Sequence, residues 1–437
     1  MNKNKLFWIL LGLAIADFLG AIDSTGINVA LPTITRDLSI PISVSQWIPN
    51  IYTLILVSTL IFWGKVGDQI GPKKLYIIGL SIFGITSLAL GLSNNAVVII
   101  ILRAIQGLST AILYTMPMAI IAHLWKDREK AFAVTASFFA GGMLVGPLIG
   151  GVLTGLEVYG LHGWHLLFLL NIPFVIFGLI VAQKFIPVLP QKPAEKYDFL
   201  SIVLFLSGLS MIVLSLTLIS TWFLPIGLLL IILLYFYEKN QKQPLLDFQL
   251  FKNRTFLAAN IISFCTMVAV IGMSFILTFY LQDTLGWSST MAGLAFLPVP
   301  IFTGIFAGIG GQIKDWRLGG FLTSVLLLVG MLALTQLSPS RPYYQIILPA
   351  MILISAGSGI LMSTLFAAIL GSAPTDKSGT ASGFLNTLQQ LGSLIGIALI
   401  AGLVVQYRLS FSILAIFTIF GVVAAFFMQK KASNADM

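Results

Sequence analysis

Long apolar runs, separated by short polar segments, constrain what this sequence can fold into. The first run extends from Leu6 to Pro32, which is long enough for a helix to cross a bilayer at about 1.5 Å per residue. Only 9% of the 437 residues are charged and 58% are hydrophobic, whereas soluble domains carry about 25% charged residues. The runs are too long and continuous for the strands of a membrane β-barrel. The sequence therefore predicts an all-α polytopic membrane protein.

The apolar runs predict fourteen membrane-spanning helices. Positive charge supports this number, because lysine and arginine gather in the cytoplasmic loops of membrane proteins. With fourteen spans, most of the 24 lysines and arginines fall on one side, together with both termini. An odd number of spans would break that segregation. The predicted spans are 6–32, 45–64, 74–93, 96–122, 131–154, 165–186, 198–218, 221–237, 256–282, 289–312, 318–337, 344–370, 379–406 and 409–428.

The predicted spans group into three parts. We predict a six-helix bundle over 1–187 and a second six-helix bundle with a short tail over 255–437. Between them, 188–254 is predicted to hold linkers and an inserted transmembrane hairpin of two helices. Proline-rich and polar segments on either side of the hairpin indicate extended linkers.

A short internal echo indicates that the two bundles are equivalent. Gly64 precedes Asp68 by four residues after the second span of the first bundle, and Gly311 precedes Asp315 in the same way after the second span of the other. Such repeats are common in secondary transporters.

Three charged side chains lie well inside predicted spans, away from the span ends, where a charge costs at least about 2.5 kcal/mol. Asp17, Asp23 and Arg103 must therefore face water or a partner, unless an acid is neutral part of the time. An aspartate that titrates could carry a proton; the alternative is a carboxyl that only packs helices. Asp17 and Asp23 point about 120° apart on a helix. Asp17 shares its face with Ser24 and Asn28, whereas Asp23 is free to approach Arg103.

Several segments, in a consistent order, resemble the signatures of one family. The chain is similar to the major facilitator superfamily, specifically its fourteen-helix drug:proton antiporters. The segments that carry this resemblance are Asp23–Pro32, Gly64–Lys74, Leu102–Gly107, Gly142–Gly151, Trp164–Pro173, Pro244–Phe256 and Gly379–Gly396.

The resemblance implies roles for three groups of residues. Asp23 and Arg103 would couple transport to protons; the alternative for Arg103 is a structural clamp on the first helix. The resemblance favours a cytoplasmic gate, with ordinary anchoring as the alternative. Pro72 stands where the family usually has a basic residue, which would weaken the gate. Its residues are Gly64, Asp68, Gly71, Lys73 and Asp315. The antiporter-motif helix, in which glycines every four residues also permit close packing, contains Gly142, Gly146, Pro147 and Gly150.

Polar side chains at helical spacing predict a substrate cavity. The fourth span presents one polar face that includes Arg103, and the thirteenth presents another. Hydrogen bonding between helices is the alternative explanation for such residues. The predicted cavity residues are Asp17, Asn28, Gln106, Tyr114, Asn386 and Gln390.

These features predict a proton-coupled exporter of small amphipathic or toxic compounds, working by alternating access. We expect a monomer in the bacterial cytoplasmic membrane, with both termini cytoplasmic, whose partners are substrate, protons and lipid. No nucleic-acid partner, metal, cofactor or enzymatic activity is predicted; His162 and His165 lack a third metal ligand nearby. One alternative is a dedicated exporter of a metabolite such as a siderophore or lipid-like molecule. Another is a membrane sensor that does not transport.

Overall fold

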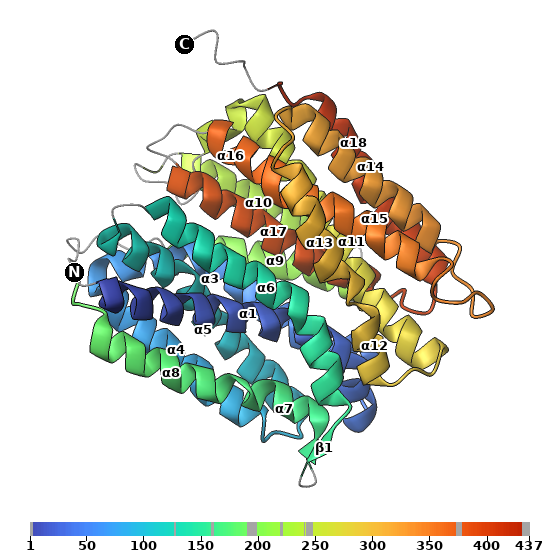
Figure 1. Ribbon diagram of the computed structural model, residues 1–437, viewed down its shortest axis with the longest axis horizontal. Coiled ribbons are helices and arrows are strands. Elements are labelled where there is room, and N and C mark those ends of the chain that lie inside the picture. Colours follow the sequence, from blue (N-terminus) through green and yellow to red (C-terminus); the bar gives the residue numbers. More distant parts are fainter. Residues whose placement is uncertain are drawn as a thin grey trace. The chain divides into compact units, whose positions relative to one another are not determined.

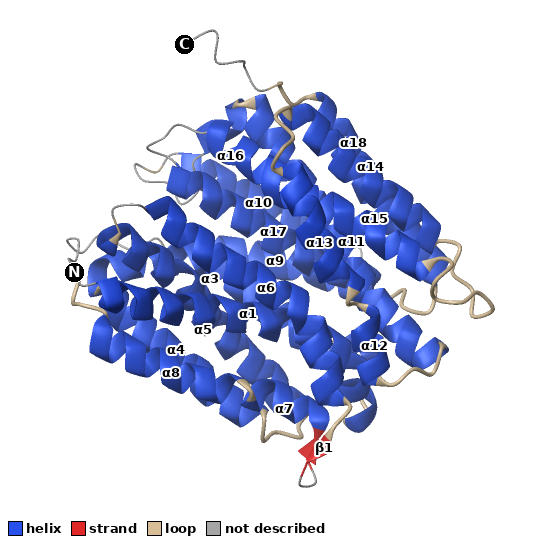
Figure 2. Ribbon diagram, in the orientation of Figure 1, coloured by secondary structure: helices blue, strands red, loops and turns tan. Residues whose placement is uncertain are grey.

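The computed structural model of the protein is almost entirely helical (Figure 2). It describes residues 3–125, 128–158, 161–189, 199–218, 222–239, 241, 248–372 and 378–430. Two compact units account for the chain. The first comprises Met1–Ser215, Ser220–Tyr237 and Trp287–Leu294, and the second comprises Leu216–Ile219, Glu238–Gly286 and Ala295–Met437.

The N-terminal part of the chain contains long helices with a short hairpin between the sixth and seventh. Gly71 separates α3 from α4 at a φ of 95°, which glycine adopts readily, and Pro72 begins α4 as a favourable first helical residue. The elements are α1 (Lys3–Asp37), α2 (Ile42–Ser45), α3 (Trp47–Ile70), α4 (Pro72–Leu90), α5 (Ala96–Leu124), α6 (Arg128–Thr154), β1 (Glu157–Val158), β2 (Leu161–His162), α7 (Gly163–Leu169), α8 (Asn171–Phe185), α9 (Phe199–Leu218) and α10 (Phe223–Lys239).

The C-terminal part of the chain is also helical. Two of its long helices continue directly into short π-helical segments, η2 and η3, a local irregularity found frequently at functional sites. The elements are the 3₁₀ segment η1 (Phe248–Lys252), α11 (Arg254–Phe279), η2 (Tyr280–Thr284), α12 (Ser289–Ala295), α13 (Pro298–Gly310), α14 (Trp316–Leu334), α15 (Ile347–Ile360), η3 (Leu361–Leu365), α16 (Phe366–Ser372), α17 (Ser378–Ala401) and α18 (Tyr407–Phe426).

Helix packing inside the first unit centres on α1 and α5. The helix α1 packs along α6 and also against α8, while α5 packs against α3 and α4 (Figure 1). A buried apolar cluster from α1, α4, α5 and α8 includes Leu13, Phe83, Ile112 and Val175. This core fixes α1 against the helices that carry the other polar side chains of the site.

The second unit repeats this pattern of contacts in the same order along the chain. Its pairs α11–α17, α11–α18, α13–α15, α14–α15 and α14–α18 correspond to α1–α6, α1–α8, α3–α5, α4–α5 and α4–α8 of the first unit. Five corresponding pairs of packed helices support the equivalence of the two bundles, which the repeated spacing of Gly64–Asp68 and Gly311–Asp315 predicts.

The structure supports a multi-pass membrane protein and a smaller number of clear spans than predicted. Among the described residues, ten helices are long and apolar enough to cross a membrane, and the bent α6 makes up to eleven. The other predicted spans coincide with α3, α9 and α10. The described apolar part of α9, Leu200–Leu216, is shorter than those ten helices. The count of fourteen and the membrane-inserted hairpin therefore remain predictions.

Candidate functional site

Arg103, in the first half of α5, is completely buried, and its guanidinium makes several contacts. Its Nη1 donates to Asp23 Oδ2 at 2.5 Å and to Gln106 Oε1 at 2.7 Å, and its Nε donates to the Ile48 carbonyl at 3.2 Å. The guanidinium carbon also lies 4.0 Å from the centre of the Tyr52 ring, a favourable cation–π distance. The predicted approach of Asp23 to Arg103 is confirmed.

The Asp23–Arg103 pair is almost fully withdrawn from solvent, because 7% of Asp23 and none of Arg103 is exposed. In such a setting each charge depends on the other, since removing one partner leaves an uncompensated buried charge. The clamp and proton-coupling interpretations of Arg103 are compatible with the same geometry, because Arg103 ties α1 to α5 and to the start of α3.

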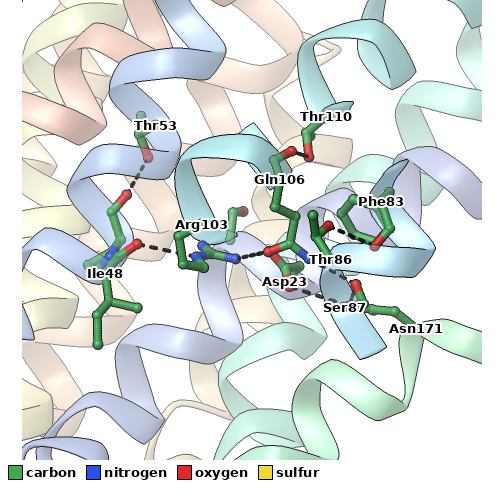
Figure 3. A network of polar contacts seen from close by, with 12 residues as sticks. Asp23, Ile48, Thr53, Phe83, Thr86, Ser87, Arg103, Gln106, Thr110 and Asn171 are labelled. Atoms are coloured by element: carbon green, nitrogen blue, oxygen red, sulfur yellow. Dashed lines mark hydrogen bonds and ion pairs between the residues drawn. The ribbon is translucent and has the colours of Figure 1, made fainter. Parts of the chain in front are cut away.

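The ion pair belongs to a closed ring of hydrogen bonds (Figure 3). Gln106 Nε2 donates to Ser87 Oγ at 2.9 Å, and Asn171 Nδ2 donates to the same hydroxyl at 3.2 Å. Asn171 Nδ2 also reaches Asp23 Oδ1 at 3.4 Å. Helices α1, α4, α5 and α8 each contribute at least one member, so the ring joins four helices at one buried point.

Sequence reasoning missed Ser87, Asn171 and Tyr52. Asn171 is the first residue of α8, directly after the break at Leu170 that separates α7 from α8. It lies in the family-like segment Trp164–Pro173, so a polar residue two positions before a proline in an apolar run was an available signal. Ser87 carried no such signal, because one serine in an apolar helix usually bonds to its own backbone.

The predicted cavity residues of the first unit occupy different environments. Gln106 is fully buried within the ring, and Asn28 is buried with an Oδ1 that has no hydrogen-bond partner among the described residues. Asp17 is half-buried on α1, with Tyr76 and Tyr114 close enough to interact with it electrostatically. Tyr114 also interacts electrostatically with Asp23, so the two acids share this neighbour, whereas the bond to Arg103 described above is made by Asp23.

Two aromatic pairs join α6 to α1 and α5, and one of them includes Tyr114. The Tyr114 ring lies against Gly20 of α1 and makes an edge-to-face contact with Phe139 of α6, with centroids 5.4 Å apart. Phe18 and Phe138 form a similar pair with centroids 6.3 Å apart. In the second unit, Asn386 and Gln390 are half-buried on α17.

Most of the predicted gate residues lie at or near the ends of helices. Lys73 Nζ donates to the carbonyls of Gln183 at 3.2 Å and Ile186 at 2.5 Å, at the C-terminal end of α8, where a cation is favourable. Asp315 caps α14 by accepting from the backbone N–H groups of Arg317 at 3.0 Å and Leu318 at 3.2 Å. Among the atoms that the structure describes, none lies within 4 Å of a Cβ built on Gly64. The Asp68 side chain lies outside the described part of the structure.

The glycines of α6 allow α1 to approach very closely. A Cβ on Gly142 would lie 2.5 Å from the Phe18 carbonyl oxygen, a Cβ on Gly146 would overlap Thr25, and one on Gly150 would overlap the Gly26 carbonyl. The helix bends by 41° between Ser137–Met143 and Val145–Thr154. Pro147 explains this bend, since it removes the hydrogen bond to the carbonyl four residues earlier.

Replacing Gly150 by alanine should destabilise the α1–α6 contact by about 1–3 kcal/mol, because the new methyl group has no free volume. Gly141→Ala is the matched control: among the described residues, the atom nearest its Cβ would be Phe18 Cε2 at 3.9 Å, which is ordinary contact. We expect the folded fraction after a heat step in detergent to fall for Gly150→Ala and to stay at the wild-type value for Gly141→Ala. Equal behaviour of the two variants would contradict this packing.

The described part of the chain offers no metal centre, as no group of three or more His, Cys, Asp or Glu side chains is placed to hold an ion there. His162 instead lies beside Asp37, with Nδ1 3.4 Å from Oδ2, and Trp164 Nε1 donates to that oxygen at 3.0 Å. His165 stacks on Trp164 with ring centroids 3.6 Å apart.

A helical membrane protein with a buried ion pair linking its helices has the features of a secondary transporter, and comparison with known proteins gives the family. Residues 13–397 match the Major Facilitator Superfamily, and the chain belongs to that family.

Named relatives and solved structures agree with this membership. The chain is 31% identical to the riboflavin transporter RibZ of Clostridioides difficile over 92% of this chain and 89% of the relative. It is 30% identical to the methyl viologen resistance protein SmvA of Salmonella typhimurium over 93% of this chain and 84% of the relative. In fold it is similar to a POT family transporter, with a TM-score of 0.70, 14% identity and coverage of 95% and 94% of the two chains.

Proposed function

We propose that this protein is a proton-coupled exporter of small amphipathic compounds. The observation that supports the proposal most strongly is the buried ion pair between Asp23 and Arg103. A carboxylate kept at membrane depth is costly and is usually functional. Asp23 would bind a proton from one side of the membrane and release it to the other as the transporter changes its accessible side.

The membrane gradient supplies enough energy for such a site. One proton moving down 100 mV releases about 2.3 kcal/mol from the electrical term alone. No other energy source is needed for export by alternating access. We further propose that the protein lies in the bacterial cytoplasmic membrane, with both termini in the cytoplasm, and that the monomer is the working unit.

Transport into proteoliposomes with an acidic lumen tests this function. Methyl viologen and riboflavin are the first probes, followed by a panel of amphipathic cations and neutral aromatic compounds. We expect accumulation of at least one compound against its gradient, and its collapse when a protonophore removes the pH difference. Accumulation that is unchanged by the protonophore would show that protons do not drive the transport.

A second candidate is export of one particular metabolite. The similarity to a riboflavin transporter favours keeping it, whereas the similarity to a methyl viologen resistance protein favours broader export of toxic compounds. The same panel separates the two, because a dedicated exporter should accept one compound and its close analogues. A membrane sensor should move none of them.

We propose that Asp17 selects for positive charge in the substrate. It is half-buried, lies outside the Asp23 ring, and interacts electrostatically with Tyr114. A carboxylate and an aromatic ring that act on the same region suit a cationic amphipathic compound.

Asp17→Asn should weaken transport of cations about tenfold, the effect of losing roughly 1.4 kcal/mol of interaction, while neutral compounds keep their rate. Initial rates for methyl viologen and for a transported neutral compound measure this ratio. Equal loss for both classes would make Asp17 a structural or proton-path residue instead.

A further inference from the structure

Asn171 occupies an unusual place in the ring, because one side-chain atom serves two neighbours. Its Nδ2 donates both to Asp23 Oδ1 and to Ser87 Oγ (Figure 3). Its Oδ1, by contrast, is buried and has no hydrogen-bond partner among the described residues. Leaving a buried acceptor unsatisfied is costly, so this arrangement of the amide invites a functional explanation.

The hydroxyl of Ser87 has a hydrogen that it does not donate within the ring. It accepts from Gln106 Nε2 at 2.9 Å as well as from Asn171 Nδ2. A serine hydroxyl has two acceptor lone pairs and one hydrogen to donate. With both lone pairs occupied, its hydrogen has no acceptor among the contacts of the ring.

Protonation of Asp23, followed by rotation of the Asn171 amide, would give Asn171 Oδ1 two donors and the Ser87 hydroxyl hydrogen an acceptor. A proton taken from water onto Asp23 Oδ1 creates an O–H donor, which then faces another donor, Asn171 Nδ2, across 3.4 Å. Rotating the Asn171 amide by 180° exchanges its oxygen and nitrogen. The oxygen then accepts from the Asp23 acid and from the Ser87 hydroxyl, while Ser87 still accepts from Gln106. The amide nitrogen moves to the position that Oδ1 held, which has no hydrogen-bond partner among the described residues. Release of the proton to water reverses these steps, and Asp23 Oδ2 stays against Arg103 throughout.

We propose that Asn171 is a positioning residue whose amide rotates by 180° when the protonation state of Asp23 changes. The amide donates to the Asp23 carboxylate and accepts from the protonated Asp23 acid. The proposal rests on the proposed proton coupling and adds a residue that regulates it. The amide would satisfy both states of Asp23 without moving a helix, and would thereby set the pH range over which the transporter binds and releases its proton.

The other groups that act on Asp23 are held constant by the geometry. Arg103 and Tyr114 of α5 and Tyr52 of α3 are the titratable side chains with described electrostatic contact to Asp23. On α8 and α4, the facing members of the ring are the neutral Asn171 and Ser87. A substitution of Asn171 therefore changes the hydrogen bonding of Asp23 and leaves these neighbours in place.

Two substitutions of Asn171 should move the pH dependence of transport in opposite directions. Asn171→Leu has a similar shape but removes the acceptor for the acid, while the carboxylate loses only one long bond and keeps Arg103. The pH of half-maximal transport should therefore fall by about one unit. Asn171→Asp places a second carboxylate beside Asp23, and two such groups share a proton, so this pH should rise by about one unit or more.

The experiment measures initial uptake into proteoliposomes over a range of pH, using whichever probe the wild-type protein transports. Asn260→Leu is the matched control: Asn260 is a fully buried asparagine of α11 whose Nδ2 bonds to the Phe256 carbonyl of its own helix, and its substitution should leave the midpoint unchanged. Asn171→Ala replaces the leucine variant if that variant does not fold. A midpoint that stays fixed, or that moves the same way in the leucine and aspartate variants, would overturn the proposal.

An infrared titration of the purified protein separates this proposal from the proposed function. The C=O stretch of the protonated Asp23 carboxyl, identified by its loss in Asp23→Asn, needs no substrate. Its midpoint should move to lower pH in Asn171→Leu even if no compound of the panel is transported. If transport is proton-driven but the band midpoint does not move in Asn171→Leu, the role of Asn171 is wrong while the function stands.

Discussion

Asp23→Asn should reduce gradient-driven accumulation of substrate to background while the protein remains folded. Arg103 loses its counter-ion, which lowers stability, but the amide oxygen can still accept from Arg103 Nη1, which bonds to Asp23 Oδ2 in the wild-type protein. A hydrogen bond between α1 and α5 is therefore retained. An amide cannot take up and release a proton, however. Coupling is therefore lost while most of the packing is preserved, and downhill exchange of substrate should survive.

Accumulation against a gradient and downhill exchange are measured in the same proteoliposome preparation. Asp37→Asn is the control, because Asp37 also lies on α1 but at its far end, where it accepts from Trp164 Nε1, a bond that asparagine can keep. We expect wild-type accumulation for this control. Wild-type accumulation by Asp23→Asn would mean that another group carries the proton.

Arg103→Leu should cost about 3–5 kcal/mol of stability, the usual effect of removing one partner from a buried ion pair. The substitution leaves the Asp23 carboxylate without its cation and frees the Ile48 carbonyl and Gln106 Oε1 from their donor. Gradient-driven transport should be lost as well. The folded fraction after a heat step in detergent, followed by size exclusion, measures the stability change.

A double variant distinguishes charge pairing from general damage to the core. Asp23→Leu combined with Arg103→Leu removes both charges, so it should recover part of the folded fraction that Arg103→Leu loses. Arg317→Leu is the control for losing an arginine: this side chain is exposed on α14 and lies 5.6 Å from the Phe426 ring. A double variant no more stable than Arg103→Leu would show that the two charges do not depend on each other.

The length of the apolar runs was sufficient to predict the class of fold and most of the helices. Spans such as 96–122 and 256–282 coincide with α5 and α11, because a membrane leaves few other ways to satisfy backbone hydrogen bonds. The number of membrane-spanning helices was harder to predict where helices are short. Helix α10 has 17 residues and the described apolar part of α9 has no more, so length alone does not show that they cross the bilayer.

The charged residues of the site were also visible in the sequence. Asp23 and Arg103 stand out because an isolated charge in an apolar run is costly, and helical spacing placed Asp17 on a different face of α1. Gln106 was found on the Arg103 face, although it was predicted to line a cavity. The structure places it in the buried ring instead, bonded at both ends of its amide.

By itself, the sequence determined that the chain is a helical membrane protein, which acids and bases lie inside its spans, and how each side chain is oriented on its own helix. These properties depend on local composition and on the 3.6-residue period of a helix. Only the tertiary structure decided that Ser87 and Asn171 join Gln106, Arg103 and Asp23, because these residues come from four helices separated by long stretches of chain. Hydrogen bonds form over about 3 Å, so neutral polar residues reveal such a role only when packing brings their helices together.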